Sequence, residues 1–267
     1  MRILIPYDFS SNAQHALRYA LHVFPASEHE ITVAHIFLTD SIRPVLPLPD
    51  DHLIRKEVLE NLRESLGSFP ESSQIKLEAA YGLPNEVLVQ MAKEKAIDLV
   101  IMGTHGADQA YRLLLGTHAS YVASHAPCAV YIVPENSVLQ TPKRVAIAID
   151  PHHPVVPGNM ELIRSLPLEH LEIISVANTY KQAGEIEELA WLLELRKLDM
   201  FSLNVIEPSG SIDLTLEKLV HDKSISLIAI IRRKHRFPES LFHDSVLSRV
   251  TKSAKMPVLV LPGEKNE

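Results

Sequence analysis

An internal repeat constrains the fold of this 267-residue chain more than any other feature. Residues 145–150 (VAIAID) restate residues 3–8 (ILIPYD), and residues 255–262 (KMPVLVLP) restate residues 127–134 (PCAVYIVP). The two aspartates stand 142 positions apart and the two closing prolines 128, so the second copy is 14 residues shorter. We therefore expect a tandem duplication, with one domain over residues 1–136 and a second over residues 143–267.

Within each copy, short β-branched runs alternate with longer stretches of helical period. Strands that are apolar on both faces and separated by helices form parallel sheets covered on both sides. We expect two doubly wound α/β domains, each with a parallel five-stranded, Rossmann-like sheet. The expected strands are 2–6, 31–37, 75–80, 98–102 and 129–133, then 144–149, 171–177, 202–206, 226–231 and 257–261. The expected helices are 11–23, 51–66, 84–95 and 117–125, then 156–165, 183–199, 212–221 and 244–253.

Composition excludes several partners. The net charge is -7, and residues 232–236 form a lone basic block that we expect in a solvated loop, so no nucleic-acid partner is predicted. No apolar run approaches the ~18 residues of a membrane span, and the first apolar run is too short for a signal peptide. We therefore expect a cytoplasmic protein with no membrane partner. The single cysteine, Cys128, excludes an intramolecular disulfide framework.

A glycine motif follows the fourth expected strand. Gly103 and Gly106 come directly after an apolar run, and Gly116-Thr117 precedes the next expected helix. Glycine permits a positive φ and close approach to a ligand, while the N–H groups at a helix start attract an anion. The pattern predicts a phosphate site, although a plain strand-to-helix turn is the alternative. In such sheets ligands bind where the strand order reverses, which would bring Asp8 close to Gly103.

The first copy resembles the universal stress protein family. Its nucleotide-binding members carry G-x2-G-x9-G-[S/T] after the fourth strand, which Gly103, Gly106, Gly116 and Thr117 match, and an aspartate after the first strand, which Asp8 matches. Residues 96–106, 112–117 and 125–130 are similar to the family throughout, and the second copy resembles it in pattern.

The resemblance implies an adenine nucleotide-binding fold of the alpha hydrolase-like type, with ATP or another adenine nucleotide in the first copy. Asp8 would approach the ribose or adenine, the backbone near Ile36 would read the adenine, and the glycine motif would surround the phosphates. Mg or Mn, if bound, would be carried by the phosphates, and we expect no dedicated metal site and no catalytic residue. The full set of expected ligand contacts is Pro6, Tyr7, Asp8, Ile36, Met102, Gly103, His105, Gly106, Gly116, Thr117 and His118.

The second copy departs from the motif. Counting back from the closing prolines, the three glycines and Thr117 fall on Ile231, Lys234, Asp244 and Ser245. A β-branched residue does not readily take a positive φ, and an aspartate at a helix start would repel a phosphate. We interpret the second copy as a degenerate, structural domain.

Two classes of function stay open, and a third fits less well. The first is a regulatory or stress-response protein that binds ATP, ADP or AMP; the second is a slow ATPase or phosphotransferase. The motif lacks the Walker lysine and the metal-binding carboxylates of fast phosphoryl transfer, which favours the first class. A vestigial pocket fits the second copy better than the first.

The last strands of the two copies, 129–133 and 258–261, are apolar sheet edges. We expect them to pair in an intramolecular pseudo-dimer, and a further homodimer stays open.

Overall fold

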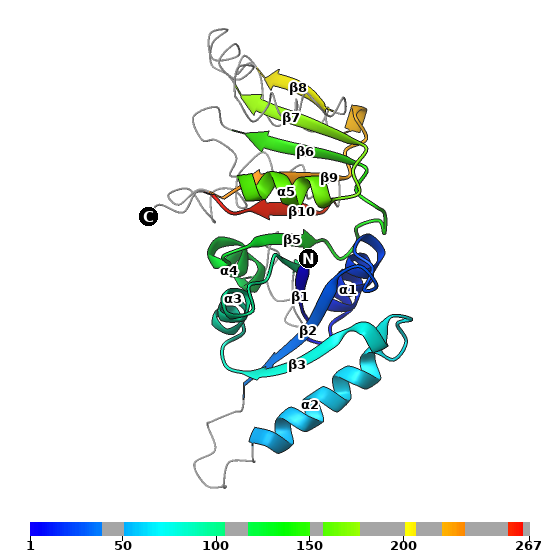
Figure 1. The fold of residues 1–267 in the computed structure, drawn as a ribbon, viewed down its shortest axis with the longest axis vertical. Helices are drawn as coiled ribbons and strands as arrows, with labels where there is room; N and C mark the ends of the chain where they lie inside the picture. The colour runs from blue at the N-terminus through cyan, green and yellow to red at the C-terminus, as the bar shows by residue number, and fades with distance from the viewer. Residues whose placement is uncertain are drawn as a thin grey trace. The chain divides into compact units, whose positions relative to one another are not determined.

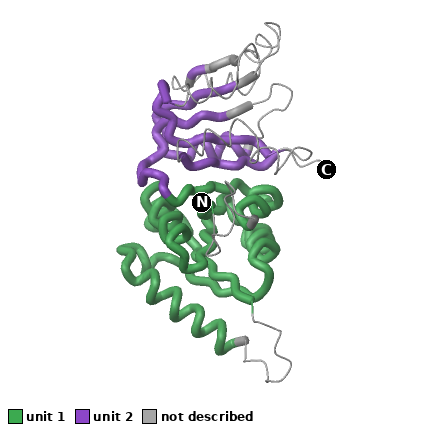
Figure 2. The backbone as a smooth tube through the Cα atoms, turned by 180° about the vertical axis from the view of Figure 1, so that it is seen from behind, with its two compact units in different colours: residues 1–135 green, residues 136–267 purple. Residues whose placement is uncertain are grey.

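A computed structural model describes residues 1–38, 51–104, 117–149, 157–176, 201–206, 221–232 and 256–263. Its internal contacts divide the chain into two compact units, residues 1–135 and 136–267 (Figure 2). Both units consist of parallel strands, with helices in the connections (Figure 1). No helix in the described ranges is both long enough and apolar enough to cross a membrane.

The first unit contains five parallel strands in the order β3-β2-β1-β4-β5. The expected doubly wound fold is therefore confirmed, and the strand and helix bounds differ from the expected ones by one residue at most. The strands are β1 (Arg2–Pro6), β2 (Glu30–Phe37), β3 (Lys76–Tyr81), β4 (Leu99–Gly103) and β5 (Ala129–Val133). The helices are α1 (Ser11–Val23), α2 (Asp51–Leu66), the short 3₁₀ helix η1 (Ser72–Gln74), α3 (Pro84–Glu94) and α4 (Thr117–His125).

The order of these strands determines where a ligand can bind. From β1 to β3 the chain moves outward on one side of β1, and it then crosses to β4 and β5 on the other side. Because parallel crossovers are right-handed, this reversal puts α1 and α2 on one face of the sheet and α3 and α4 on the other. The reversal falls between β1 and β4, so the carboxyl ends of these two strands form the topological switch point.

The second unit repeats this order as β10-β9-β6-β7-β8, again with parallel pairs only. The expected helices 183–199 and 244–253, and all but the last residue of 212–221, lie outside the described residues. The described elements are β6 (Arg144–Ile149), α5 (Pro157–Ser165), β7 (His170–Val176), β8 (Phe201–Ile206), β9 (Leu227–Ile231) and β10 (Val258–Leu261).

Each unit has an equivalent hydrogen bond at the amino end of its first strand. Arg2, which begins β1, donates from Nη1 to the carbonyl oxygen of Lys95 at 3.1 Å. Arg144, which begins β6, donates from Nη1 to the carbonyl oxygen of Lys223 at 3.4 Å. Each arginine therefore fastens the first strand of its unit to the turn that precedes the fourth, as expected for copies of one ancestral domain.

The turn after each of these lysines has the same backbone strain. Ala96 has a φ of 47° and Ser224 a φ of 53°, both in the left-handed region that side chains disfavour. At the end of α3 the N–H of Ile97 donates to the carbonyl of Ala92 and the N–H of Ala96 to that of Lys93, at 2.9 and 3.2 Å. These two bonds form a Schellman motif, and Ala96 occupies the position that usually holds glycine.

Candidate functional site

The carboxyl ends of β1, β2 and β4 converge at the switch point of the first unit. Leu4 of β1 is in register with Val100 of β4, and Pro6 of β1 with Ala34 of β2. Because the strands are parallel, the expected ligand contacts at and after their carboxyl ends lie at one edge of the sheet. These contacts are Pro6, Tyr7, Asp8, Ile36, Met102 and Gly103.

Asp8 helps to start α1. Its Oδ1 accepts hydrogen bonds from the backbone N–H of Ser10 at 3.1 Å and from the Ser10 hydroxyl at 2.5 Å. Ser10 is the N-cap of α1, and its hydroxyl oxygen accepts from the N–H of Ala13 at 3.1 Å. Helix α1 begins at Ser11, as expected from the sequence. A carboxylate is an acceptor of hydrogen bonds, which is the chemistry that a sugar hydroxyl requires.

Phe9 holds Asp8 in a strained turn. Its φ of 64° is left-handed, a conformation that costs about 1–2 kcal/mol for a residue with a β-carbon. Its ring contacts the rings of Tyr7 and His35, with centroids 5.4 and 4.9 Å away. Strain of this kind persists where the surroundings hold it and is concentrated at functional sites. Nothing in the sequence indicated this turn, because the expected source of a positive φ was glycine.

Gly103 is required for packing against α1. A β-carbon at this position would lie 2.6–2.8 Å from the amide end of the Asn12 side chain, closer than atoms can approach. Asn12 is buried and donates from Nδ2 to the hydroxyl of Thr104 at 3.4 Å. Gly103 does not have a positive φ. The positive φ expected from the sequence is therefore wrong at this glycine. Close approach to Asn12 accounts for the glycine, and the expected close approach to a ligand stays a prediction.

Asn12 and Thr104 are residues of the switch point that sequence reasoning missed. Both are buried, and together they tie the first turn of α1 to the end of β4. A signal for Asn12 was available: it is a polar residue on the face of α1 that carries the buried Ala16 and Tyr19. A buried amide on an apolar helix face indicates a specific polar partner.

The other expected ligand contacts differ in how exposed their side chains are. Tyr7 points into the core, since its side chain is 2% exposed and its hydroxyl pairs with that of Ser65 on α2 at 2.7 Å. Its backbone N–H donates to Ala34 at 2.8 Å, which leaves little for a ligand. Met102 is buried, whereas Pro6 and Ile36 are half-buried at the strand ends.

Two helices begin near this edge, and they differ in their surroundings. The first turn of α1 already has its cap, and the Ser11 hydroxyl donates to Glu135 at 2.9 Å, which brings a second carboxylate close. A further anion is therefore disfavoured at the start of α1. Helix α4 begins at Thr117, the residue directly after Gly116. The exposed His118 contacts the amide oxygen of Asn85 through Nδ1. His105, Gly106 and Gly116 lie outside the described residues.

The second unit has a different residue at the end of its fourth strand. Ile231 ends β9 and is in register with Leu261, as Gly103 ends β4 and is in register with Val133. The offset counted from the closing prolines is therefore confirmed at this position. The second unit therefore has a branched side chain at the position of Gly103, in agreement with the loss of the glycine motif from its sequence.

The fold and its switch point define a doubly wound α/β protein with a potential ligand-binding edge. Residues 1–134 match the universal stress protein family. A universal stress protein of Methanocaldococcus jannaschii is 31% identical over 140 residues, which cover 49% of this chain and 81% of that protein. The chain belongs to the universal stress protein family.

Solved structures extend the likeness to the whole chain, as a likeness of fold. A universal stress protein from Archaeoglobus fulgidus has a TM-score of 0.63 at 19% identity and covers 100% of this chain and 97% of its own. The cytoplasmic domain of a prokaryotic cation chloride cotransporter has a TM-score of 0.57 at 14% identity, covering 99% and 97%. Proteins with different roles therefore share this fold, and function must be argued from the site.

Proposed function

We propose that the first unit binds one adenine nucleotide, ATP or a close relative, and that the chain is a regulatory universal stress protein. The observation that supports this most is the convergence of β1 and β4: Asp8 follows one strand, and the glycine motif that starts at Gly103 follows the other. The motif ends at the start of α4, where backbone N–H groups favour phosphate.

The described residues suit the parts of a nucleotide differently. Asp8 would accept a hydrogen bond from a ribose hydroxyl, and Ile36 and Met102 would supply the apolar wall for a base. The phosphates would lie toward α4 and Thr117, because the carboxylates near α1 repel them. Phe9 and Asn12 would act by positioning, the first through the Asp8 turn and the second through Gly103.

A divalent cation, Mg or Mn, would be bound mainly through the phosphates. Such ions take oxygen ligands and bind near nucleotides through one or two carboxylates and phosphate oxygens. Cation binding should therefore depend on the nucleotide and be weak without it.

The alternative is a slow ATPase. Its discriminating signal is steady phosphate release that disappears when the motif is altered, whereas a regulatory protein would retain intact nucleotide over many hours. The direct test is mass spectrometry of the small molecules released from the natively purified, heat-denatured protein. We expect an adenine nucleotide at close to one per chain. Recovery of a different ligand class, or of none after incubation with ATP and gel filtration, would contradict the proposal.

We also propose that the second unit serves as the partner surface in an intramolecular pseudo-dimer. Strands β5 and β10 are apolar and are each at the edge of their own five strands, and such edges associate when they are left unpaired. Residues 1–136 expressed alone should dimerise or aggregate in size-exclusion chromatography with light scattering. A soluble monomer with unchanged nucleotide affinity would contradict this proposal.

A further inference from the structure

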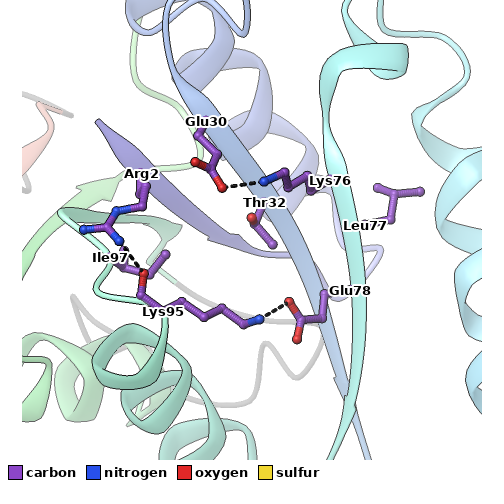
Figure 3. Close-up of a pocket in the computed structure, with 8 residues that line it drawn as sticks. All are labelled: Arg2, Glu30, Thr32, Lys76, Leu77, Glu78, Lys95 and Ile97. Carbon is purple, nitrogen blue, oxygen red and sulfur yellow. Dashed lines mark hydrogen bonds and ion pairs between the residues drawn. The ribbon is translucent and has the colours of Figure 1, made fainter.

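A hollow of about 470 Å³ lies in the first unit at the amino ends of β1, β2 and β3, opposite the switch point (Figure 3). Thr32 of β2, which is 8% exposed, lies between two ion pairs that border it. Lys76 pairs with Glu30 at 2.5 Å, and Lys95 pairs with Glu78 at 3.0 Å. With Arg2, the lining carries three cationic side chains and two carboxylates.

The same place in the second unit contains a buried carboxylate. The side chain of Glu172 on β7 is 1% exposed, and its Oε1 lies 3.2 Å from Nε2 of His170 and 3.7 Å from Nζ of Lys223. Its Oε2 accepts a hydrogen bond from the Ser202 hydroxyl. Burying a carboxylate is costly unless polar neighbours compensate it, and Ser202, His170 and Lys223 are the groups that surround this one.

Register shows that Thr32 and Glu172 are equivalent positions. Thr32 is opposite Leu4, two residues after Arg2, and Glu172 is opposite Ala146, two residues after Arg144. On the next strand, Thr32 is in register with Lys76, as Glu172 is with Ser202.

The lysines near these positions are also equivalent. The carbonyls of Lys95 and Lys223 accept the same arginine hydrogen bond, described above for each unit. Of the groups at the carboxylate site, the first unit keeps the lysine, whereas Glu30 is at the position of His170 and Lys76 at that of Ser202. The first unit also has a small side chain where the second unit has its own carboxylate.

We propose that the hollow of the first unit binds a small aliphatic carboxylic acid, whose carboxylate takes the place that Glu172 fills in the second unit. The Thr32 hydroxyl donates to the carboxylate, and its cationic partners are Lys95, at the position of Lys223, and Lys76, at the position of Ser202. One added negative charge balances the excess of one cation in the lining. Leu77 and Ile97 supply apolar surface for a short hydrocarbon chain.

The size of the hollow also favours a free small molecule. A volume of about 470 Å³ is within the range of pockets for metabolite-sized ligands, about 300–1,000 Å³. The ion pairs at the border are partly exposed, and such pairs are weak, so Lys95 can share its charge between Glu78 and a ligand at little cost. This inference does not depend on nucleotide binding, because the hollow is at the other end of the strands.

The test is a titration of the full chain with sodium butyrate, followed by NMR of the methyl groups of Thr32, Leu77 and Ile97. Sodium chloride at equal ionic strength is the control for screening. Thr32→Val keeps the size and burial of the side chain but removes the hydroxyl, and Lys95→Met removes the cation. We expect saturable shifts with butyrate, and an apparent Kd raised about tenfold or more in each variant, as for a lost hydrogen bond to a charged group.

Two reciprocal variants transfer the residue of one unit to the other. Thr32→Glu should fill the hollow and abolish the butyrate shifts, whereas Glu172→Thr should open a second hollow and create new shifts near β7. The proposal is overturned if butyrate causes no saturable shift, if chloride causes the same shifts, or if Thr32→Val leaves the Kd unchanged. Thr32→Val is a conservative substitution that should fold. It therefore tests the proposal even if Thr32→Glu fails to fold.

Discussion

The close packing of Asn12 against Gly103 leads to a quantitative prediction for the stability of Gly103→Ala. In Gly103→Ala, the new β-carbon would be 2.6–2.8 Å from the Asn12 amide, so this side chain must move and give up its 3.4 Å hydrogen bond with Thr104. Overpacking of a filled site costs about 1–3 kcal/mol, and a lost hydrogen bond about 0.5–1.5 kcal/mol. Part of this is offset by the lower entropy of the unfolded alanine variant. We expect a net loss of about 1–3 kcal/mol in the free energy of unfolding.

A double-mutant cycle separates this clash from a general intolerance of alanine. The atoms in conflict are the terminal ones of Asn12, so Asn12→Ala removes them, and Gly103→Ala should then cost close to nothing. The coupling should be about 1–3 kcal/mol. Urea unfolding, with hydrogen exchange of the β1 and α1 peptides as the readout of the first unit, measures it. Gly158→Ala in α5 is the matched control, because a β-carbon there meets nothing within 4 Å. Additive effects of the two substitutions would refute the reasoning.

Three further substitutions test single features of the first unit. Ala96→Gly should stabilise it by about 1 kcal/mol in urea unfolding, since it relieves the φ of 47° in the Schellman motif; a loss of stability would contradict the strain. Burial lowers the pKa of His29 below 6.5, so the unfolded state binds more protons and stability falls as the pH drops below about 6.5. His29→Gln should reduce the change in unfolding free energy between pH 7 and 5. The hydrogen bond with Lys76 lowers the pKa of Glu30 from 4.5, so Glu30 affects stability only at lower pH. Burial raises the pKa of Tyr131 well above 10, so stability should fall as the pH rises past 10, and less steeply in Tyr131→Phe; equal slopes would argue against its burial.

The sequence predicted the framework of both units. Periodicity located the described strands and α-helices but not the short η1, because strands that are buried on both faces and joined by amphipathic helices leave an unambiguous pattern. The repeat predicted a tandem duplication, and the described strands of the two units have the same order. These features depend on many residues at once, so single exceptions do not obscure them.

The chemistry of the switch point was less predictable, because it depends on single contacts between distant segments. Nothing local to Phe9 indicates a left-handed turn, since its surroundings hold the strain. A positive φ was expected at Gly103 and is wrong, and its packing against Asn12 could not be predicted because the two residues are 91 positions apart in the sequence.

Calorimetric titration of the full chain with ATP in the presence of Mg tests the central claim most directly. We predict one site per chain, lost in Gly116→Val and retained in the control Gly158→Ala, with circular dichroism showing that both variants are folded. Two sites per chain, or unchanged affinity in folded Gly116→Val, would contradict the account of a single nucleotide site in the first unit.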